Sequence, residues 1–138
     1  MAATLTRVIG FRAEHHYRLQ EWSEADNLRA FGSLTEPHPH DYRCAVTVTG
    51  PMDPRTGMIL DLGLLDRILE EEISRPFHGR QLNRDVAEFG PGGILPTCEA
   101  MAAYLFRRIG PRLPPPARLT RIRVEEDPTL YGEWTAPA

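Results

Sequence analysis

The middle of this sequence holds two amphipathic helical patterns in succession, and strand patterns lie on both sides of them. Asp61 is a suitable N-cap for the first helix, in which apolar residues recur every three or four positions until Pro76 ends it. Thr97 can cap the second helix, whose apolar face continues to the stop signal at Gly110-Pro111. Adjacent helices between paired strands indicate an α+β fold.

Four segments have the composition and alternation of strands. They are Thr4–Ala13, Tyr42–Gly50, Leu119–Glu126 and Thr129–Trp134. The order β-β-α-α-β-β predicts an antiparallel sheet with both helices on one face, built as a single domain over residues 1–138. Such a sheet has two open edges, and we therefore expect other subunits to complete a barrel.

The composition excludes several classes of function. The net charge is −3 and no stretch gathers basic residues, which argues against nucleic acid and anionic membranes as partners. Every basic residue is arginine, so Schiff-base and phosphate-binding lysines are ruled out. Cys44 and Cys98 have no paired spacing, and no apolar run approaches a membrane span; we expect a protein of the reducing cytoplasm.

The polar segment from Glu14 to Asp41 reads as one long loop, and it holds four of the five histidines. His38 and His40 are two positions apart at the entry to a strand, where a period of two places both imidazoles on one face. His15 or His16, at the end of the neighbouring strand, can supply a third. Three histidine ligands with an open fourth position are typical of a catalytic zinc site.

Several short motifs along the chain share the order and spacing of one enzyme superfamily. They are Phe11-Arg-Ala-Glu-His15, Asn27-Leu-Arg-Ala-Phe31-Gly32, His38-Pro-His40-Asp-Tyr42, Gly50-Pro-Met-Asp53-Pro-Arg-Thr56-Gly57-Met-Ile-Leu-Asp61, Leu82-Asn83, Pro96-Thr97-Cys-Glu99 and Val124-Glu-Glu126. Together they resemble the 6-pyruvoyl-tetrahydropterin and 6-carboxytetrahydropterin synthases over nearly the whole chain.

The resemblance implies a tunnelling fold assembled as a homohexamer, a dimer of trimers with the active site between subunits. It also implies a lyase that acts on 7,8-dihydroneopterin triphosphate or a related pterin. By position, His15, His38 and His40 would bind zinc, which would act as a Lewis acid on the substrate hydroxyls. His16 would not be a ligand, and Glu126 would hold the pterin ring by accepting two hydrogen bonds.

The proton-handling residues depart from the family pattern. Leu34 stands where the family has its catalytic cysteine. On the second polar loop, from Phe77 to Leu95, His78 and Gly79 stand at the family's Asp-His pair, or Phe77 and His78 after a shift of one residue. His78 and Glu36 are the candidate catalytic residues, with His16 and Asp41 as others. Arginines on polar loops offer bidentate contacts to a triphosphate, and the sequence selects none of them. These are Arg18, Arg29, Arg43 and Arg80.

Three explanations of these departures remain open. The protein is a divergent synthase or lyase with other bases, it processes a different pterin or purine-like ligand, or it binds a pterin without turning it over.

Overall fold

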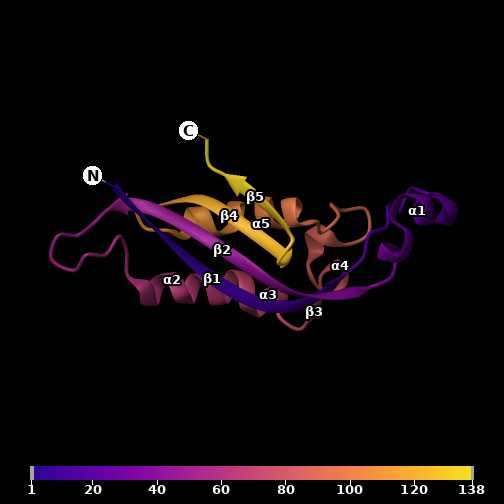
Figure 1. The fold of residues 1–138 in the computed structure, drawn as a ribbon, viewed down its shortest axis with the longest axis horizontal. Coiled ribbons are helices and arrows are strands. Elements are labelled where there is room, and N and C mark those ends of the chain that lie inside the picture. The colour runs from indigo at the N-terminus through magenta and orange to yellow at the C-terminus, as the bar shows by residue number, and fades with distance from the viewer. Residues whose placement is uncertain (1, 138) are drawn as a thin grey trace.

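The structure is a computed structural model that describes residues 2–137. Five strands form one sheet in the order β3-β1-β2-β4-β5, and all neighbours are antiparallel except β1 and β3 (Figure 1). The strands are β1 Ala2–His15, β2 His38–Pro51, β3 Arg80–Gln81, β4 Arg118–Asp127 and β5 Leu130–Thr135. The predicted α+β class and antiparallel sheet are confirmed, and β3 adds a short edge strand that the sequence pattern did not predict. Closure of a barrel by other subunits stays a prediction.

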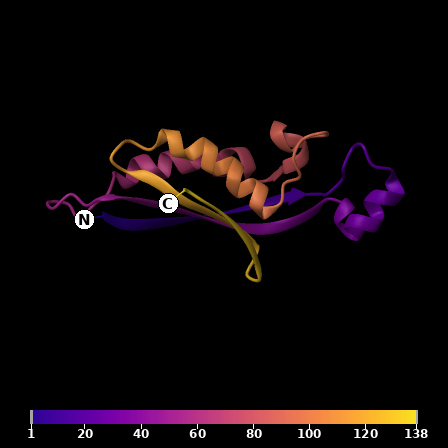
Figure 2. The ribbon, with the colours of Figure 1, turned by 90° about the horizontal axis from the view of Figure 1, so that it is seen from above.

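The two long helical segments cover one face of the sheet (Figure 2). The first comprises α2 (Leu62–Leu69), a π-helical turn (Glu70–Ser74) and α3 (Arg75–Phe77); the second is α5 (Cys98–Ile109), followed by a 3-10 turn (Gly110–Arg112). Apolar side chains of the covered face and of the helices are fully buried between the layers. They include Val46, Val48, Ile122 and Val124 from the sheet and Leu65, Ile68, Leu105 and Ile109 from the helices.

The predicted caps are present, whereas one predicted helix end is wrong. The side chains of Asp61 and Thr97 accept hydrogen bonds from Gly63 and Ala100 at the starts of α2 and α5. Pro76 does not end the first helical segment, which continues to Phe77. The wider π-helical turn directly precedes this proline, and we attribute its tolerance to that turn, since a proline ring clashes with the carbonyl of a regular α-helical turn.

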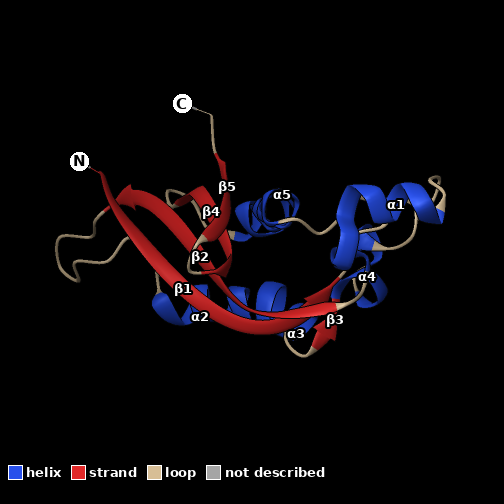
Figure 3. Ribbon diagram, turned by 45° about the vertical axis from the view of Figure 1, so that its right-hand side comes forward, coloured by secondary structure: helices blue, strands red, loops and turns tan. Residues whose placement is uncertain are grey.

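The segment Glu14–Asp41 is more ordered than predicted. β1 extends to His15 and β2 begins at His38, and between them lie α1 (Glu24–Phe31) and a 3-10 turn (Gly32–Thr35). The second polar loop likewise contains β3, α4 (Leu82–Asp85) and a 3-10 turn (Ala87–Phe89). Figure 3 shows α1 and α4 at the same end of the sheet. These elements are short and mostly exposed, so they lack the apolar periodicity that identifies longer helices.

None of the helices within residues 2–137 is long and apolar enough to cross a bilayer.

Candidate metal centre

Strand pairing brings the three predicted histidines together. In the β1–β2 register His15 lies opposite His38, and Ala13 lies opposite His40. Since side chains alternate along a strand, all three imidazoles share the helix-covered face with Phe11 and Tyr42. Their candidate ligand atoms lie within 4.8 Å of one another. The expectation that a period of two would place His38 and His40 together is confirmed.

Hydrogen bonds on the outer nitrogens prepare two of these rings for a metal. Nδ1 of His15 lies 2.9 Å from the carbonyl oxygen of Pro96, and Nδ1 of His38 lies 2.8 Å from that of Glu36. A carbonyl accepts only from a protonated nitrogen, so both Nδ1 atoms carry the hydrogen and both Nε2 lone pairs are free. This is the usual arrangement around metal-binding histidines.

The inner nitrogens need a partner that the protein does not supply. Nε2 of His15 and Nε2 of His40 are buried and have no hydrogen-bond partner among residues 2–137. Burial is the main cause that lowers the pKa of His15 to about 4, because it penalises the charged imidazolium. A neutral imidazole with a buried free lone pair can bind a metal ion, so the residues of this cluster fit a zinc-type ion.

Tyr42 adds a second contact behind His15. Its hydroxyl lies 3.0 Å from Nδ1 of His15, and its ring stacks on Phe11 with centroids 4.9 Å apart. Burial also raises the pKa of the Tyr42 phenol, which therefore stays neutral. The His15 ring is thus fixed by both Pro96 and Tyr42.

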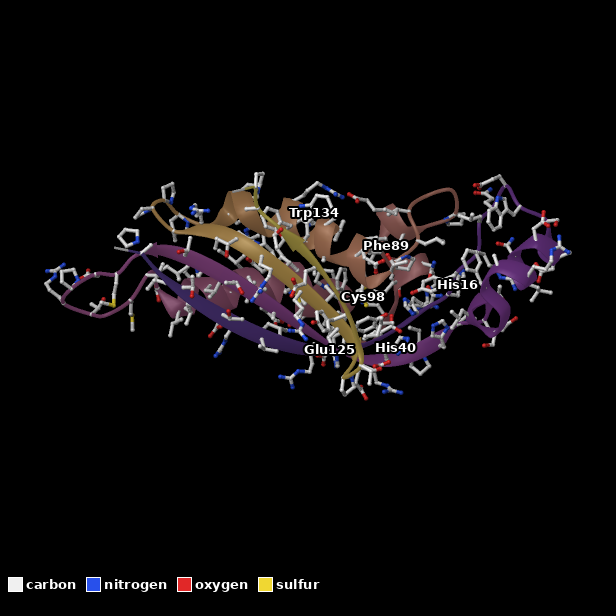
Figure 4. All side chains as sticks on the ribbon, turned by 45° about the horizontal axis from the view of Figure 1, so that its top comes forward. His16, His40, Phe89, Cys98, Glu125 and Trp134 are labelled. Atoms are coloured by element: carbon white, nitrogen blue, oxygen red, sulfur yellow. The ribbon has the colours of Figure 1, made fainter. Side chains whose placement is uncertain are left out.

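Glu126 and Cys98 border the metal centre. Oε2 of Glu126 lies 3.1 Å from Nε2 of His40, an approach whose angles do not make a hydrogen bond. The Cys98 thiol donates to Oε1 of the same carboxylate over 3.4 Å. Figure 4 shows His40 and Cys98 near one another at the end of the sheet. By contrast, the neighbouring Glu125 approaches arginines, Arg43 at 3.8 Å and Arg123 at 3.9 Å.

The two candidate catalytic residues have other contacts in this subunit. The exposed carboxylate of Glu36 lies 3.7 Å from Arg18, while its backbone carbonyl holds His38. His78 is exposed, and its Nδ1 accepts a hydrogen bond from the backbone N–H of Arg12 at the outer edge of β1. Leu34, at the position of the family's cysteine, is exposed. The catalytic roles of Glu36 and His78 therefore stay predictions.

Two asparagines in the quoted motifs hold the backbone beside the site. Asn83 accepts from the backbone N–H of His16 and donates to the carbonyl of the same residue, over 2.9 and 3.0 Å. Asn27 is buried and binds Leu19 in the same two-fold way, over 2.8 and 3.1 Å. His16 itself bonds Gln81 and lies outside the metal-binding group.

Tyr17, which the sequence did not indicate as a site residue, also lies beside the histidines. The Tyr17 ring lies 4.8 Å from that of His15 and 6.1 Å from that of His38, measured between centroids. Burial is again the main cause that raises the pKa of the Tyr17 phenol. No strand or helix pattern indicates this position, because Tyr17 lies two residues beyond the end of β1.

The architecture, with two helices on one face of an antiparallel sheet and a three-histidine centre at its end, is that of a tunnelling-fold protein. The family model described as 6-pyruvoyl tetrahydropterin synthase matches residues 4–136, and the chain belongs to this family.

Individual relatives agree with this family assignment. The human protein named 6-pyruvoyl tetrahydrobiopterin synthase is 35% identical over 81% of this chain and 77% of its own length. The Drosophila melanogaster protein of the same name is 34% identical over 98% of this chain and 80% of its own. The structure of the Caenorhabditis elegans 6-pyruvoyl tetrahydropterin synthase superposes with a TM-score of 0.89 at 27% identity, covering 99% of this chain and 97% of that one.

Proposed function

We propose that this protein is a zinc-dependent lyase of the 6-pyruvoyl-tetrahydropterin synthase type that acts on 7,8-dihydroneopterin triphosphate or a closely related pterin. One observation carries the proposal: a carboxylate, Glu126, stands 3.1 Å from one of three histidines whose ligand atoms lie within 4.8 Å of one another. The names of the relatives support the same reaction class.

The resemblance to the family suggests the proposed roles, and the geometry supports them. His15, His38 and His40 hold the ion, which when bound supplies Lewis acidity toward the hydroxyls of the substrate side chain. Glu126 accepts two hydrogen bonds from the guanidine-like edge of the pterin, and Cys98 orients that carboxylate. Tyr42 and Pro96 keep the proton of His15 on Nδ1, facing away from the ion.

Proton transfer is assigned to Glu36 and His78. Within one subunit these side chains contact Arg18 and Arg12. We therefore propose that the active site is completed between subunits of a homohexamer, with His78 supplied by a neighbouring chain. Both cysteines are buried and unpaired, which supports a reducing cytoplasmic location.

The test is incubation of metal-quantified protein with 7,8-dihydroneopterin triphosphate, with product identification by mass spectrometry. His38→Ala should lose both zinc and product, whereas the matched variant His16→Ala should keep its zinc. A product whose side chain is shortened, or has lost its triphosphate by elimination to leave a pyruvoyl group, supports the lyase if only zinc-loaded protein makes it. Bound zinc and bound pterin with unchanged substrate would refute it.

A non-catalytic pterin-binding protein is the second candidate. The exposed Leu34 favours it, because leucine cannot transfer a proton and this side chain occupies the position of the family's cysteine. This candidate predicts zinc-dependent pterin binding by fluorescence titration, without turnover.

A further inference from the structure

A cavity of about 890 Å³ adjoins the metal centre without containing it. None of the three histidines and neither Glu126 nor Cys98 lines it. Three of its lining residues are instead direct sequence neighbours of the centre: His16 follows His15, Pro37 precedes His38, and Leu95 precedes Pro96, whose carbonyl holds His15. Consecutive Cα atoms are about 3.8 Å apart, so three separate segments place this cavity against the metal centre.

The cavity is basic in a chain whose net charge is −3. Arg18 and Arg84 line it together with His16, and no acidic side chain is among the lining residues within the described part of the chain. The rest of the wall combines the amide side chains of Gln20, Gln81 and Asn83 with apolar residues that include Val86, Phe89 and Leu95. Arginines on a partly apolar wall suit a phosphate, because the guanidinium matches its oxygens by two parallel hydrogen bonds.

His16 presents a further donor to this cavity. The backbone N–H of Arg84 donates to Oε1 of Gln81, which identifies the other atom of that amide as the NH₂ group. This NH₂ group lies 2.8 Å from Nδ1 of His16, so Nδ1 accepts and Nε2 carries the hydrogen. The amide of Gln81 therefore fixes the His16 tautomer that donates through Nε2.

The arginines are already paired, but with partners outside the cavity wall. Arg18 contacts Glu24 and lies 3.7 Å from Glu36, and Arg84 lies 3.0 Å from Asp85. Each pair has one largely exposed member, since the side chains of Glu24, Glu36 and Arg84 are 63%, 76% and 73% exposed, while Arg18 and Asp85 are 33% and 20% exposed. Solvent screens such pairs, so a polyphosphate can compete with these carboxylates for the arginines.

We propose that this cavity binds the polyphosphate tail of the substrate through Arg18, Arg84 and His16. The inference rests on the proposed function for the identity of the substrate. It gives the subunit a linear order in which Glu126 faces the ring, the histidines face the side-chain hydroxyls, and the arginine cavity receives the phosphates. The order of groups in a pterin with a phosphorylated side chain is the same.

The experiment compares three ligands on zinc-loaded protein: 7,8-dihydroneopterin triphosphate, 7,8-dihydroneopterin without phosphate, and inorganic tripolyphosphate. Pterin binding is followed by rapid-mixing fluorescence before turnover, and tripolyphosphate binding by calorimetry with metal content checked afterwards. The test variant is Arg18→Gln/Arg84→Gln. The control is Arg55→Gln/Arg67→Gln, which removes the same charge. Arg55 belongs to the turn after β2 and Arg67 to α2, and Figure 1 shows that turn at the end of the molecule opposite α1.

The test variant should bind the triphosphate and tripolyphosphate about tenfold or more weakly than wild type, since charge-assisted hydrogen bonds are lost. Its affinity for unphosphorylated dihydroneopterin and its zinc content should be unchanged, and the control should match wild type for all ligands. Ala87→Trp, which narrows the cavity without altering its charge, should show the same selective loss. This second variant decides the question if the double variant does not fold.

Equal affinity of wild type and both test variants for the triphosphate would overturn the inference. So would a wild type that binds the triphosphate no more tightly than dihydroneopterin. Failure of the proposed function is distinguishable: wild type would then bind neither pterin, while arginine-dependent binding of tripolyphosphate would still support an anion site in this cavity.

Discussion

The thiol of Cys98 donates a hydrogen bond to Oε1 of Glu126 across 3.4 Å. Cys98 is the first residue of α5 and Glu126 lies near the end of β4, so the contact joins the start of a helix to the end of a strand. Burial is the main cause that raises the pKa of this thiol to about 12, and it therefore keeps its proton. One oxygen of Glu126 is fixed in this way while the other stays near His40.

Replacing this thiol should weaken pterin binding without affecting the metal. We expect Cys98→Val to raise the dissociation constant for 7,8-dihydroneopterin about threefold to tenfold, because one hydrogen bond to the carboxylate is lost. Cys98→Ser keeps a donor and should stay close to wild type. Fluorescence titration measures both, and a valine variant that binds like wild type would show that the thiol does not orient Glu126.

Removing the Tyr42 hydroxyl behind His15 should weaken metal binding. Tyr42→Phe takes away a group 3.0 Å from Nδ1, and loss of such an outer partner typically costs about tenfold or more in metal affinity. Competition with a chromophoric chelator gives the zinc affinity directly. Tyr104→Phe is a suitable control, since Tyr104 packs on Phe77 and Phe89 instead. Unchanged affinity in Tyr42→Phe would mean that Pro96 alone positions the ring.

The amide of Asn83 should matter for both stability and zinc content. Asn83→Ala removes two hydrogen bonds to the backbone of His16 and should lower the free energy of unfolding by about 2 kcal/mol. Zinc occupancy should fall as well, because His15 is the preceding residue. Asn83→Asp keeps the acceptor and loses the donor, so its urea midpoint should lie between the other two. If Asn83→Ala had the urea midpoint of wild type, the two hydrogen bonds from Asn83 to His16 would not stabilise the fold.

Acid should remove one identifiable contribution to stability. The hydrogen bond from Arg84 is the main cause that lowers the pKa of Asp85 to about 2, and the hydrogen bond from the backbone N–H of Gln81 is the second cause. In the unfolded chain the pKa of this carboxyl has its ordinary value near 3.9. A lowered pKa in the folded state stabilises the fold above about pH 4 and loses this effect as the pH falls toward 2. The difference in urea midpoint between wild type and Asp85→Asn should therefore shrink between pH 5 and about pH 2.5. A constant difference would exclude this linkage.

Strand alternation allowed part of the histidine cluster to be predicted. It places His38 and His40 on one face, but it left both His15 and His16 open as the third residue, and the family resemblance selected His15, which the structure pairs with His38. The helix caps were equally local, since Asp61 and Thr97 bond residues two and three positions ahead.

Contacts between distant segments could not be predicted in this way. Cys98 reaches Glu126 only because α5 lies against β4 and β5, where Gly132 passes so close to Glu99 that an added Cβ would stand 2.8 Å from its backbone nitrogen. Neither a helical nor a strand period contains that information. The cavity beside His16 likewise depends on how the loop after α4 returns over the end of β1.

The in-register pairing of β1 with β2 has a consequence for how such a protein can change over time. The three histidines lie on the two strands, and much of the polypeptide that links His15 to His38 can be lengthened, shortened or rewritten without moving them, provided that a carbonyl remains at Glu36 to hold His38. A single insertion within β1, or between His38 and His40 in β2, would instead turn an imidazole to the opposite face. Changes in sequence and length are thus tolerated best in the linking segment, where Leu34 and Glu36 lie, while the three imidazoles keep their positions.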